Sequence, residues 1–237
     1  MLVIRSAQPE CAIEQEATAR SRRGLLKAAS VFVASTAFLE LNLAEAFAQR
    51  GATLAGGTVD LGQGDFAVLN YAYALEQLEA AFYTQVLQQP YRGFNAADEQ
   101  SLTGIQSHEV AHREFFRSAL GGNAIPDLQV DFGQVNFASR QSVLGTARTF
   151  EDLGVAAYNG AGQLLRNPDF LAKAGSIVSV EARHAATIHD MLNPYSAAFA
   201  GSDIVDGNGL DRALVPSQVL PKVVPFVLTP VSASQLP

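Results

Sequence analysis

The feature that most constrains this chain is a glutamate in the middle of an otherwise apolar helical stripe, repeated in four segments. In each segment, apolar side chains recur at alternating steps of three and four residues, which is the period of an α-helix with one buried face. The segments span about residues 65–87, 97–120, 139–165 and 168–192. Four helices that each bury one stripe predict an all-α bundle.

The lengths of the connections select one type of bundle. The first and second helices are joined by a short link, and so are the third and fourth, so each pair is expected to form an antiparallel hairpin. The link at 121–138 is much longer and can travel the length of a bundle. Two hairpins joined by one long crossover is the ferritin-like four-helix arrangement. The tail at 193–237 is expected to pack on the bundle through its apolar stretch at 215–228, as a short helix or strand.

Residues 1–48 have the features of an export signal. The stretch SRRGLLK, at 21–27, precedes a moderately apolar run, and Ala46-Phe47-Ala48 forms a cleavage site of the small-x-small type. The pattern resembles the twin-arginine (Tat) signal, with Leu25 where that signal prefers Phe. Glu40 lies within the apolar run and leaves it shorter than the ~18 residues of a membrane-spanning helix.

The signal predicts where the protein works and how it reaches that place. We expect the Tat translocase to export the chain, cleavage near Ala48, and a periplasmic or otherwise extracytoplasmic location. The Gly-rich residues 49–64 are expected to form a flexible linker. Tat exports folded proteins, so the resemblance implies that a metal or cofactor is acquired in the cytoplasm. Cys11, the only cysteine, lies in the signal, so the mature chain can form no internal disulfide.

The charge of the chain argues against two classes of partner. Removal of residues 1–48 takes away five basic and five acidic residues, so the net charge stays at −7. An acidic protein is repelled by nucleic acid and by anionic membranes. Neither is an expected partner.

The ionisable residues on the four stripes point to metal ions. A carboxylate buried without a partner costs several kcal/mol, and four together would also repel one another. Two divalent cations would supply four positive charges to balance them. Residues at i and i+3 share one face of a helix, so in each E-x-x-H motif the glutamate can bridge two metals while the histidine binds one. The residues are Glu76 on the first helix, Glu109 and His112 on the second, Glu151 on the third, and Glu181 and His184 on the fourth.

The pattern is also repeated between the two hairpins. Tyr83 follows Glu76 by seven residues, and Tyr158 follows Glu151 by seven. The second and fourth helices each carry one E-x-x-H motif. The two hairpins therefore look like copies related by a pseudo-twofold axis, which is the symmetry that suits a two-metal site.

Two single glutamates and two E-x-x-H motifs resemble the ligand set of ferritin-like di-iron and di-manganese carboxylate proteins. Bacterioferritins and rubrerythrins also place a tyrosine seven residues after the glutamate of their first helix, as at Tyr83. The stretches LEQLEAAFY, FEDLGVAAY and VEARHAA resemble the exported bacterial ferritin-like proteins that are related to plant desiccation-related proteins. The resemblance covers residues 65–192 and implies two divalent ions, Fe or Mn, with Tyr83 and Tyr158 as candidate catalytic residues.

Glu79 is a surplus acid on the stripe of the first helix. Its counterpart in the third helix is Gly154, so the internal repeat favours Glu76 as the ligand. Glu79 is then an extra or substitute metal ligand.

The stretch HEVAH, at 108–112, admits a different interpretation. In a zinc metalloprotease, His108 and His112 would bind zinc and Glu109 would be the base. That interpretation leaves the stripe residues of the other three helices unexplained. We therefore expect Glu109 and His112 to work as a pair. The other two histidines, His108 and His189, are expected on the surface or behind the ligands.

Carboxylate and imidazole ligands suit Fe or Mn, and two such ions with open positions suit redox chemistry on dioxygen or peroxide. Expected activities are Fe(II) oxidation, peroxide removal or a reaction like that of Mn catalase, linked to oxidative stress. The partners would be metal ions and small oxidants. One alternative is metal binding or storage without turnover, where storage requires a homo-oligomer. Another is a stress- or desiccation-associated structural protein.

Replacement of Arg22 and Arg23 by lysine should trap the precursor in the cytoplasm, because the Tat pathway requires the twin arginines. Immunoblots of cytoplasmic and exported fractions would measure this. Undiminished export of the double variant would rule out the Tat route.

Overall fold

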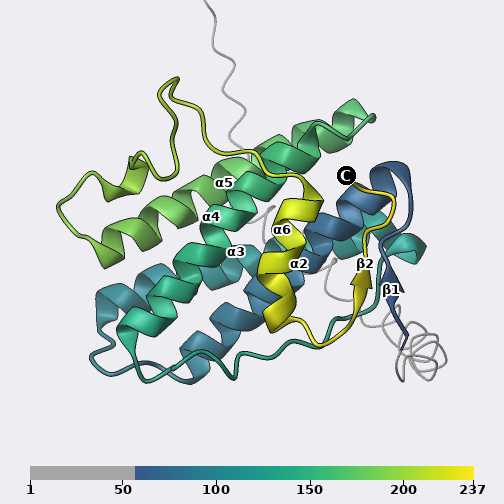
Figure 1. Cartoon of the computed structure of the whole chain (residues 1–237). Helices are drawn as coiled ribbons and strands as arrows, with labels where there is room; N and C mark the ends of the chain where they lie inside the picture. The colour runs from purple at the N-terminus through teal and green to yellow at the C-terminus, as the bar shows by residue number, and fades with distance from the viewer. Residues whose placement is uncertain (1–56) are drawn as a thin grey trace, which may run out of the picture. The chain divides into compact units, whose positions relative to one another are not determined.

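Four long helices build the structure, a computed structural model that describes residues 57–237. They are α2 (Gly64–Gln88), α3 (Ala96–Leu120), α4 (Arg140–Gly162) and α5 (Pro168–Leu192). α2 packs against α3 and α4 against α5, and a long crossover joins the two hairpins (Figure 1). The predicted all-α, ferritin-like bundle is confirmed. The predicted export signal and residues 49–56 of the predicted linker lie outside the described residues.

Polar caps at the helix starts explain where the chain turns. Asn95 accepts two backbone N–H bonds at the start of α3, and Ser139 accepts one at the start of α4. Asn167 does the same for α5, with Pro168 at the first helical position. α3 ends before Gly121, whose φ of 51° a glycine adopts without strain. These residues fix the helix boundaries within one residue of the predicted ones, except at the end of α4.

α4 ends at Gly162, three residues before the predicted end. Leu164 and Leu165 donate to carbonyl oxygens only three residues back, so the chain leaves the helix in a tight turn. Asp65, in the first turn of α2, accepts the backbone N–H groups of Arg166 and Asn167 at 2.9 and 2.8 Å. The link between α4 and α5 is thereby held against the start of α2.

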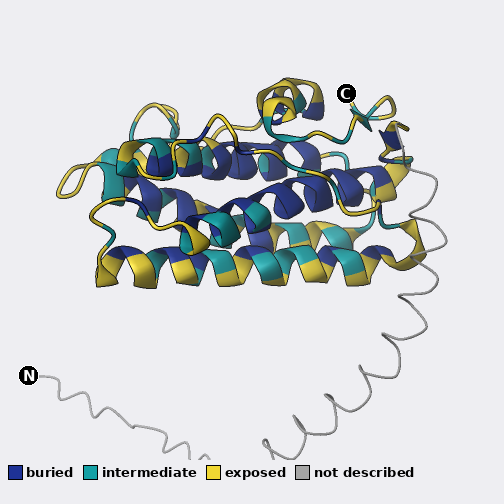
Figure 2. Ribbon diagram, turned by 90° about the horizontal axis from the view of Figure 1, so that it is seen from below, coloured by how far each residue is buried: buried dark blue, intermediate teal, exposed yellow. Residues whose placement is uncertain are grey.

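The helices differ in how much of their surface is buried. α2 and α4 are buried over most of their circumference, whereas α3 and α5 are buried along one stripe (Figure 2). The middle of α2 reads YAYALEQLEAAFY, with apolar residues on every side, which is the pattern of an interior helix. The sequence therefore distinguishes the interior helix α2 from the outer helix α3.

Two buried amides on α2 hold the crossover in place. The side chain of Asn70 accepts the N–H of Ile125 at 3.0 Å and donates to the carbonyl oxygen of Asn123 at 2.9 Å. Gln77 accepts the N–H of Leu128 at 2.7 Å. Buried polar groups are stable when they are paired in this way, so the two amides satisfy crossover groups that no helix or sheet pairs.

The two ends of the described chain meet beside the bundle. β1 (Val59–Asp60) pairs in parallel with β2 (Val231–Ser232), and Leu61 is fully buried. Residues 57–63 thus differ from the flexible linker expected there, because a short apolar segment pairs with a segment 172 residues later along the chain. The tail also forms α6 (Pro216–Val223), which buries Val219 and Val223 and contacts α4. Single 3-10 turns lie at Gly121–Asn123, Ala198–Ala200 and Val224–Phe226.

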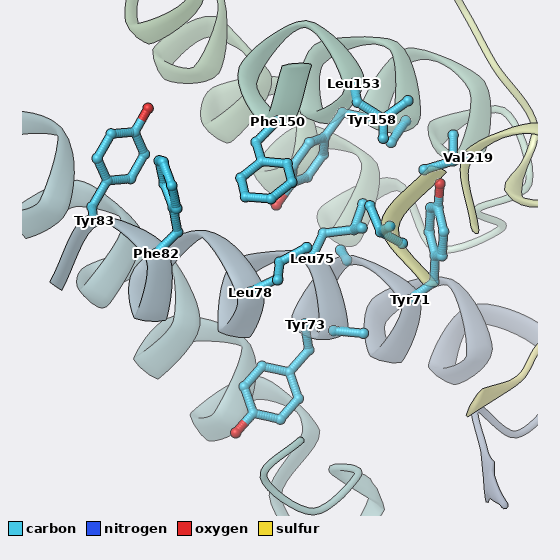
Figure 3. Packing of buried hydrophobic residues seen from close by; sticks show 14 of the residues in the cluster. Tyr71, Tyr73, Leu75, Leu78, Phe82, Tyr83, Phe150, Leu153, Tyr158 and Val219 are labelled. Carbon is cyan, nitrogen blue, oxygen red and sulfur yellow. The ribbon is translucent and has the colours of Figure 1, made fainter. Parts of the chain in front are cut away.

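Aromatic rings join the crossover and tail to the core. Phe82 on α2 meets Phe150 on α4 edge to face, with ring centroids 5.1 Å apart (Figure 3). Phe132 of the crossover lies 5.5 Å from Phe82, and Phe226 of the tail lies 4.9 Å from Phe150. Edge-to-face pairs add stabilisation beyond the burial of their area.

Within residues 57–237, no helix is both long and apolar enough to cross a membrane.

The tail crosses α4 in direct backbone contact at Gly160. The N–H of Leu214 donates to the carbonyl oxygen of Ala156 at 2.8 Å. A Cβ atom on Gly160 would lie 2.0 Å from the carbonyl oxygen of Leu214, so the crossing requires a glycine. Gly145, on the same helix, has open space around the same position.

We predict that Gly160→Ala lowers the free energy of unfolding by about 1–3 kcal/mol, since a backbone segment must move to admit the methyl group. Gly145→Ala is the matched control and should raise it by up to about 1 kcal/mol through helix propensity. Urea unfolding monitored by circular dichroism measures both. Equal behaviour of the two variants would contradict the close crossing.

Candidate metal centre

Six of the seven residues predicted to bind metal lie together in the middle of the bundle. The four glutamates have no exposed surface, and the exposed fractions of the histidine side chains are 12% and 5%. Every long helix contributes, because each residue occupies the core stripe of its helix. Helix α2 carries Glu76, α3 carries Glu109 and His112, α4 carries Glu151, and α5 carries Glu181 and His184.

The side chains form two groups that share two glutamates. In the first group, Nδ1 of His112 lies 2.8 Å from Oε1 of Glu181, 3.4 Å from Oε2 of Glu76 and 3.7 Å from Oε2 of Glu109. In the second, Nδ1 of His184 lies 2.7 Å from Oε1 of Glu109, 3.3 Å from Oε2 of Glu181 and 3.6 Å from Oε2 of Glu151. Each group offers three carboxylate oxygens and one imidazole nitrogen.

The atoms of the two groups approach one another without forming hydrogen bonds. Ten buried polar side-chain atoms lack a hydrogen-bond partner in the part of the chain that the structure describes, and eight of them belong to these six residues. Both imidazole Nδ1 atoms are among the eight, despite the short distances above. Buried polar atoms without partners are rare in folded proteins. Oxygen and nitrogen atoms that converge on one place fit divalent cations, so the two groups could hold metal ions.

The four glutamates fall into two classes. Glu76 and Glu151 each use one oxygen to accept a hydrogen bond and leave the other free. Both oxygens of Glu109 and of Glu181 are free, and each of these residues presents one oxygen to each group. Glu109 and Glu181 can therefore each contribute one oxygen to both groups, whereas Glu76 and Glu151 can each contribute one oxygen to a single group.

The two predicted tyrosines donate to the carboxylates of Glu76 and Glu151, and each reaches across to the other hairpin. Tyr83 on α2 donates to Oε1 of Glu151 on α4 at 2.5 Å. Tyr158 on α4 donates to Oε1 of Glu76 on α2. Burial, and then the nearby carboxylates, raise the pKa of both phenols well above the usual value. Both tyrosines therefore stay protonated and donate.

Protons balance part of the charge of the metal-free centre. Burial raises the pKa of Glu76 well above its usual range and that of Glu151 to about 8. Burial also opposes ionisation of Glu109, but the two imidazoles outweigh it and lower the pKa to about 2. For His112 and His184, burial opposes protonation, but the surrounding carboxylates outweigh it and raise each pKa to about 12. At neutral pH both imidazoles carry a proton.

Glu79 lies beside the centre but belongs to neither group. Its carboxylate faces Gly154, where a Cβ atom would lie 3.2 Å from Oε1 of Glu79. Burial, and then repulsion from Glu109 and Glu151, raise its pKa well above the usual range. The structure thus places Glu79 as a buried acid next to the four gathered glutamates.

The two remaining histidines lie outside both groups. His108 is exposed, and its Nδ1 lies 2.9 Å from Nε2 of His184, on the far side of that ring from the carboxylates. His189 is buried and pairs through Nε2 with Asp152 at 2.8 Å. Both histidines were expected on the surface or behind the ligands, but the helical period of the sequence did not identify the side chains that they contact.

Comparison with known proteins bears on the family alone. A search of curated proteins gives no match. Residues 64–194, which are more than half of the chain, match the family described as ferritin-like domain. The matched range spans all four long helices and both groups of ligand-type side chains. The chain therefore belongs to the ferritin-like domain family.

Proposed function

We propose that this chain binds two divalent ions, Fe or Mn, and carries out redox chemistry on dioxygen or peroxide. The observation that supports the proposal most directly is the set of eight unpartnered donor atoms, four facing each position. When bound, two such ions supply electrons and open positions for an oxygen species. Glu109 and Glu181 would bridge the ions, and Glu76 and Glu151 would each bind one.

The tyrosines and the apolar surroundings prepare the donor atoms. The hydrogen bonds from Tyr83 and Tyr158 hold one oxygen of each terminal carboxylate, so the other oxygen stays directed into the centre. Preorganised ligands need little rearrangement when an ion enters. The four glutamates have no exposed surface, so water is largely excluded from the centre. This exclusion strengthens every electrostatic interaction within it.

Glu79 suits the handling of protons rather than direct ligation. Burial raises the pKa of its carboxyl group well above the usual range, which favours the protonated form. The space left by Gly154 allows that group to lie next to Glu151, one turn away on α4. Reduction of dioxygen or peroxide consumes protons, and Glu79 is a buried group that can give one. The ligand role predicted for Glu79 then applies only if its side chain turns toward the ions.

The alternatives differ in what they require. Metal storage without turnover needs a closed shell of many subunits, and a stress-associated structural role needs no ion at all. The zinc metalloprotease requires His108 and His112 to converge on one ion. In the structure, His108 approaches Nε2 of His184 instead, and His112 groups with carboxylates from three helices. This geometry favours the dinuclear site.

We further propose that the protein is exported by the Tat translocase and works outside the cytoplasm. The twin arginines and the cleavage motif of the sequence support this proposal. Chemistry on oxygen species in an exposed compartment is consistent with a role in oxidative stress.

We predict that Glu181→Ala loses at least one ion per chain while the bundle stays helical, because a bridging carboxylate has gone. The metal-free variant should be at least as stable as the metal-free parent, since one buried acid has been removed. Metal analysis by inductively coupled plasma mass spectrometry and far-UV circular dichroism measure these outcomes. Asp190→Ala, an exposed acid on the same helix, is the matched control. Unchanged metal content in Glu181→Ala, or a single zinc in the parent, would overturn the dinuclear site.

Metal binding should release protons and strengthen as pH rises. Burial raises the pKa of Glu151 from 4.5 to about 8. The proton on Glu151 therefore stabilises the metal-free fold in full below pH 4.5, and this stabilisation is lost as the pH rises through 8. The protons on His112 and His184 stabilise the metal-free fold in the same way, and that stabilisation is lost between pH 6.5 and about 12. Because an ion displaces these protons, each proton released raises the affinity about tenfold per pH unit. Calorimetric titration with Mn²⁺ at pH 5–8, in buffers of different ionisation enthalpy, measures the proton count. A pH-independent affinity would contradict the buried ligand set.

A further inference from the structure

The two proposed metal positions have the same ligand types but different surroundings. Behind the ring of His184, Nε2 lies 2.9 Å from Nδ1 of His108. Behind the ring of His112, no described side chain or backbone group forms a hydrogen bond with Nε2. The exposed fraction of the His112 side chain is 12%, against 5% for His184. One imidazole is held from behind by protein, while the other borders solvent.

The internal repeat shows that this difference is a property of the sequence. His108 immediately precedes Glu109 on α3, and the residue in the same position before Glu181 on α5 is Val180. A valine side chain has no hydrogen-bonding group. The pseudo-twofold axis that exchanges the two metal positions therefore does not exchange their supporting residues. Val180 provides a place at which the missing partner can be added.

A partner behind an imidazole acts on the metal through the ring. An ion at Nδ1 of His184 fixes the remaining ring proton on Nε2, which then needs an acceptor. Nδ1 of His108 is in position to accept it. Such a bond fixes the ring orientation and the tautomer and increases the basicity of the ligating nitrogen. Loss of a partner of this kind typically weakens metal affinity 10–100-fold.

We propose that His108 is a positioning residue that makes the His184 position the tighter of the two metal positions. The His112 position is then the weaker one, and its ion exchanges with solvent. This proposal rests on the dinuclear function proposed above. It assigns no ligand role to His108, which distinguishes it from the zinc-protease interpretation of the same five residues.

The test is stepwise calorimetric titration of the metal-free protein with Mn²⁺, without oxygen, at one fixed pH. For the parent we expect two separate dissociation constants. His108→Ala should raise the smaller constant about 10–100-fold and leave the larger one within about twofold. His108→Asn, whose side-chain oxygen can accept the same hydrogen bond, should restore most of the affinity. Ser107→Ala, on the same exposed surface of α3, is the matched control and should change neither constant.

Val180→His provides the converse test. A histidine at this position should support His112 and lower the larger constant, so that the two binding steps move closer together. Anomalous diffraction from crystals of the parent with one equivalent of Mn²⁺ should show the ion at Nδ1 of His184.

Two results with His108→Ala and one with the parent crystals would overturn the proposal. They are unchanged constants in His108→Ala, equal weakening of both steps, or the first ion located at His112. If the parent protein binds fewer than two ions, the dinuclear function fails and this proposal fails with it. A parent that binds two ions with equal affinity overturns the proposal alone.

Discussion

The structure depends on four carboxylates placed where a helical bundle normally has leucines. Glu76, Glu109, Glu151 and Glu181 have no exposed surface, and like charges in a poorly solvated interior repel strongly. The metal-free chain tolerates them through protons: burial raises the pKa of Glu76 and of Glu151 and so favours their protonated forms, and both histidines stay charged at neutral pH. Two divalent ions would replace those protons. The centre is therefore built to have its charge balanced in either state.

The repeat of the two hairpins turns this electrostatic problem into a defined geometry. Each E-x-x-H motif supplies one carboxylate with two free oxygens and one imidazole, and each single glutamate supplies one free oxygen. The hydrogen bonds of Tyr83 and Tyr158 run between α2 and α4, so they connect the two hairpins at the level of the centre. A tyrosine in either hairpin thus positions a ligand of the other. This exchange couples the packing of the hairpins to the arrangement of the donor atoms.

The helical period of the apolar residues and the spacing of the ionisable residues were sufficient to predict the bundle and the gathering of six ionisable side chains. Period and spacing are local properties of each helix and can be read from the sequence. Contacts between segments distant in the sequence were not predictable in the same way. The pairing of Val59 with Val231 depends on two short segments that carry no strong signal. The seven-residue spacing singled out Tyr83, but its bond to Glu151 depends on how the hairpins cross. The early end of α4 reflects a turn stabilised by Asp65, a residue 97 positions before Gly162.

The residues that break the internal repeat of the two hairpins lie around one of the two groups of ligand-type side chains. Gly154, the counterpart of Glu79, leaves room for that acid one turn from Glu151. His108, the counterpart of Val180, reaches the far side of His184. Glu151 and His184 belong to the same group, and the other group has neither an added acid nor a supporting imidazole among the described residues. In the proposed dinuclear site, a symmetric ligand set in asymmetric surroundings would give the two ions different affinities and different access to protons.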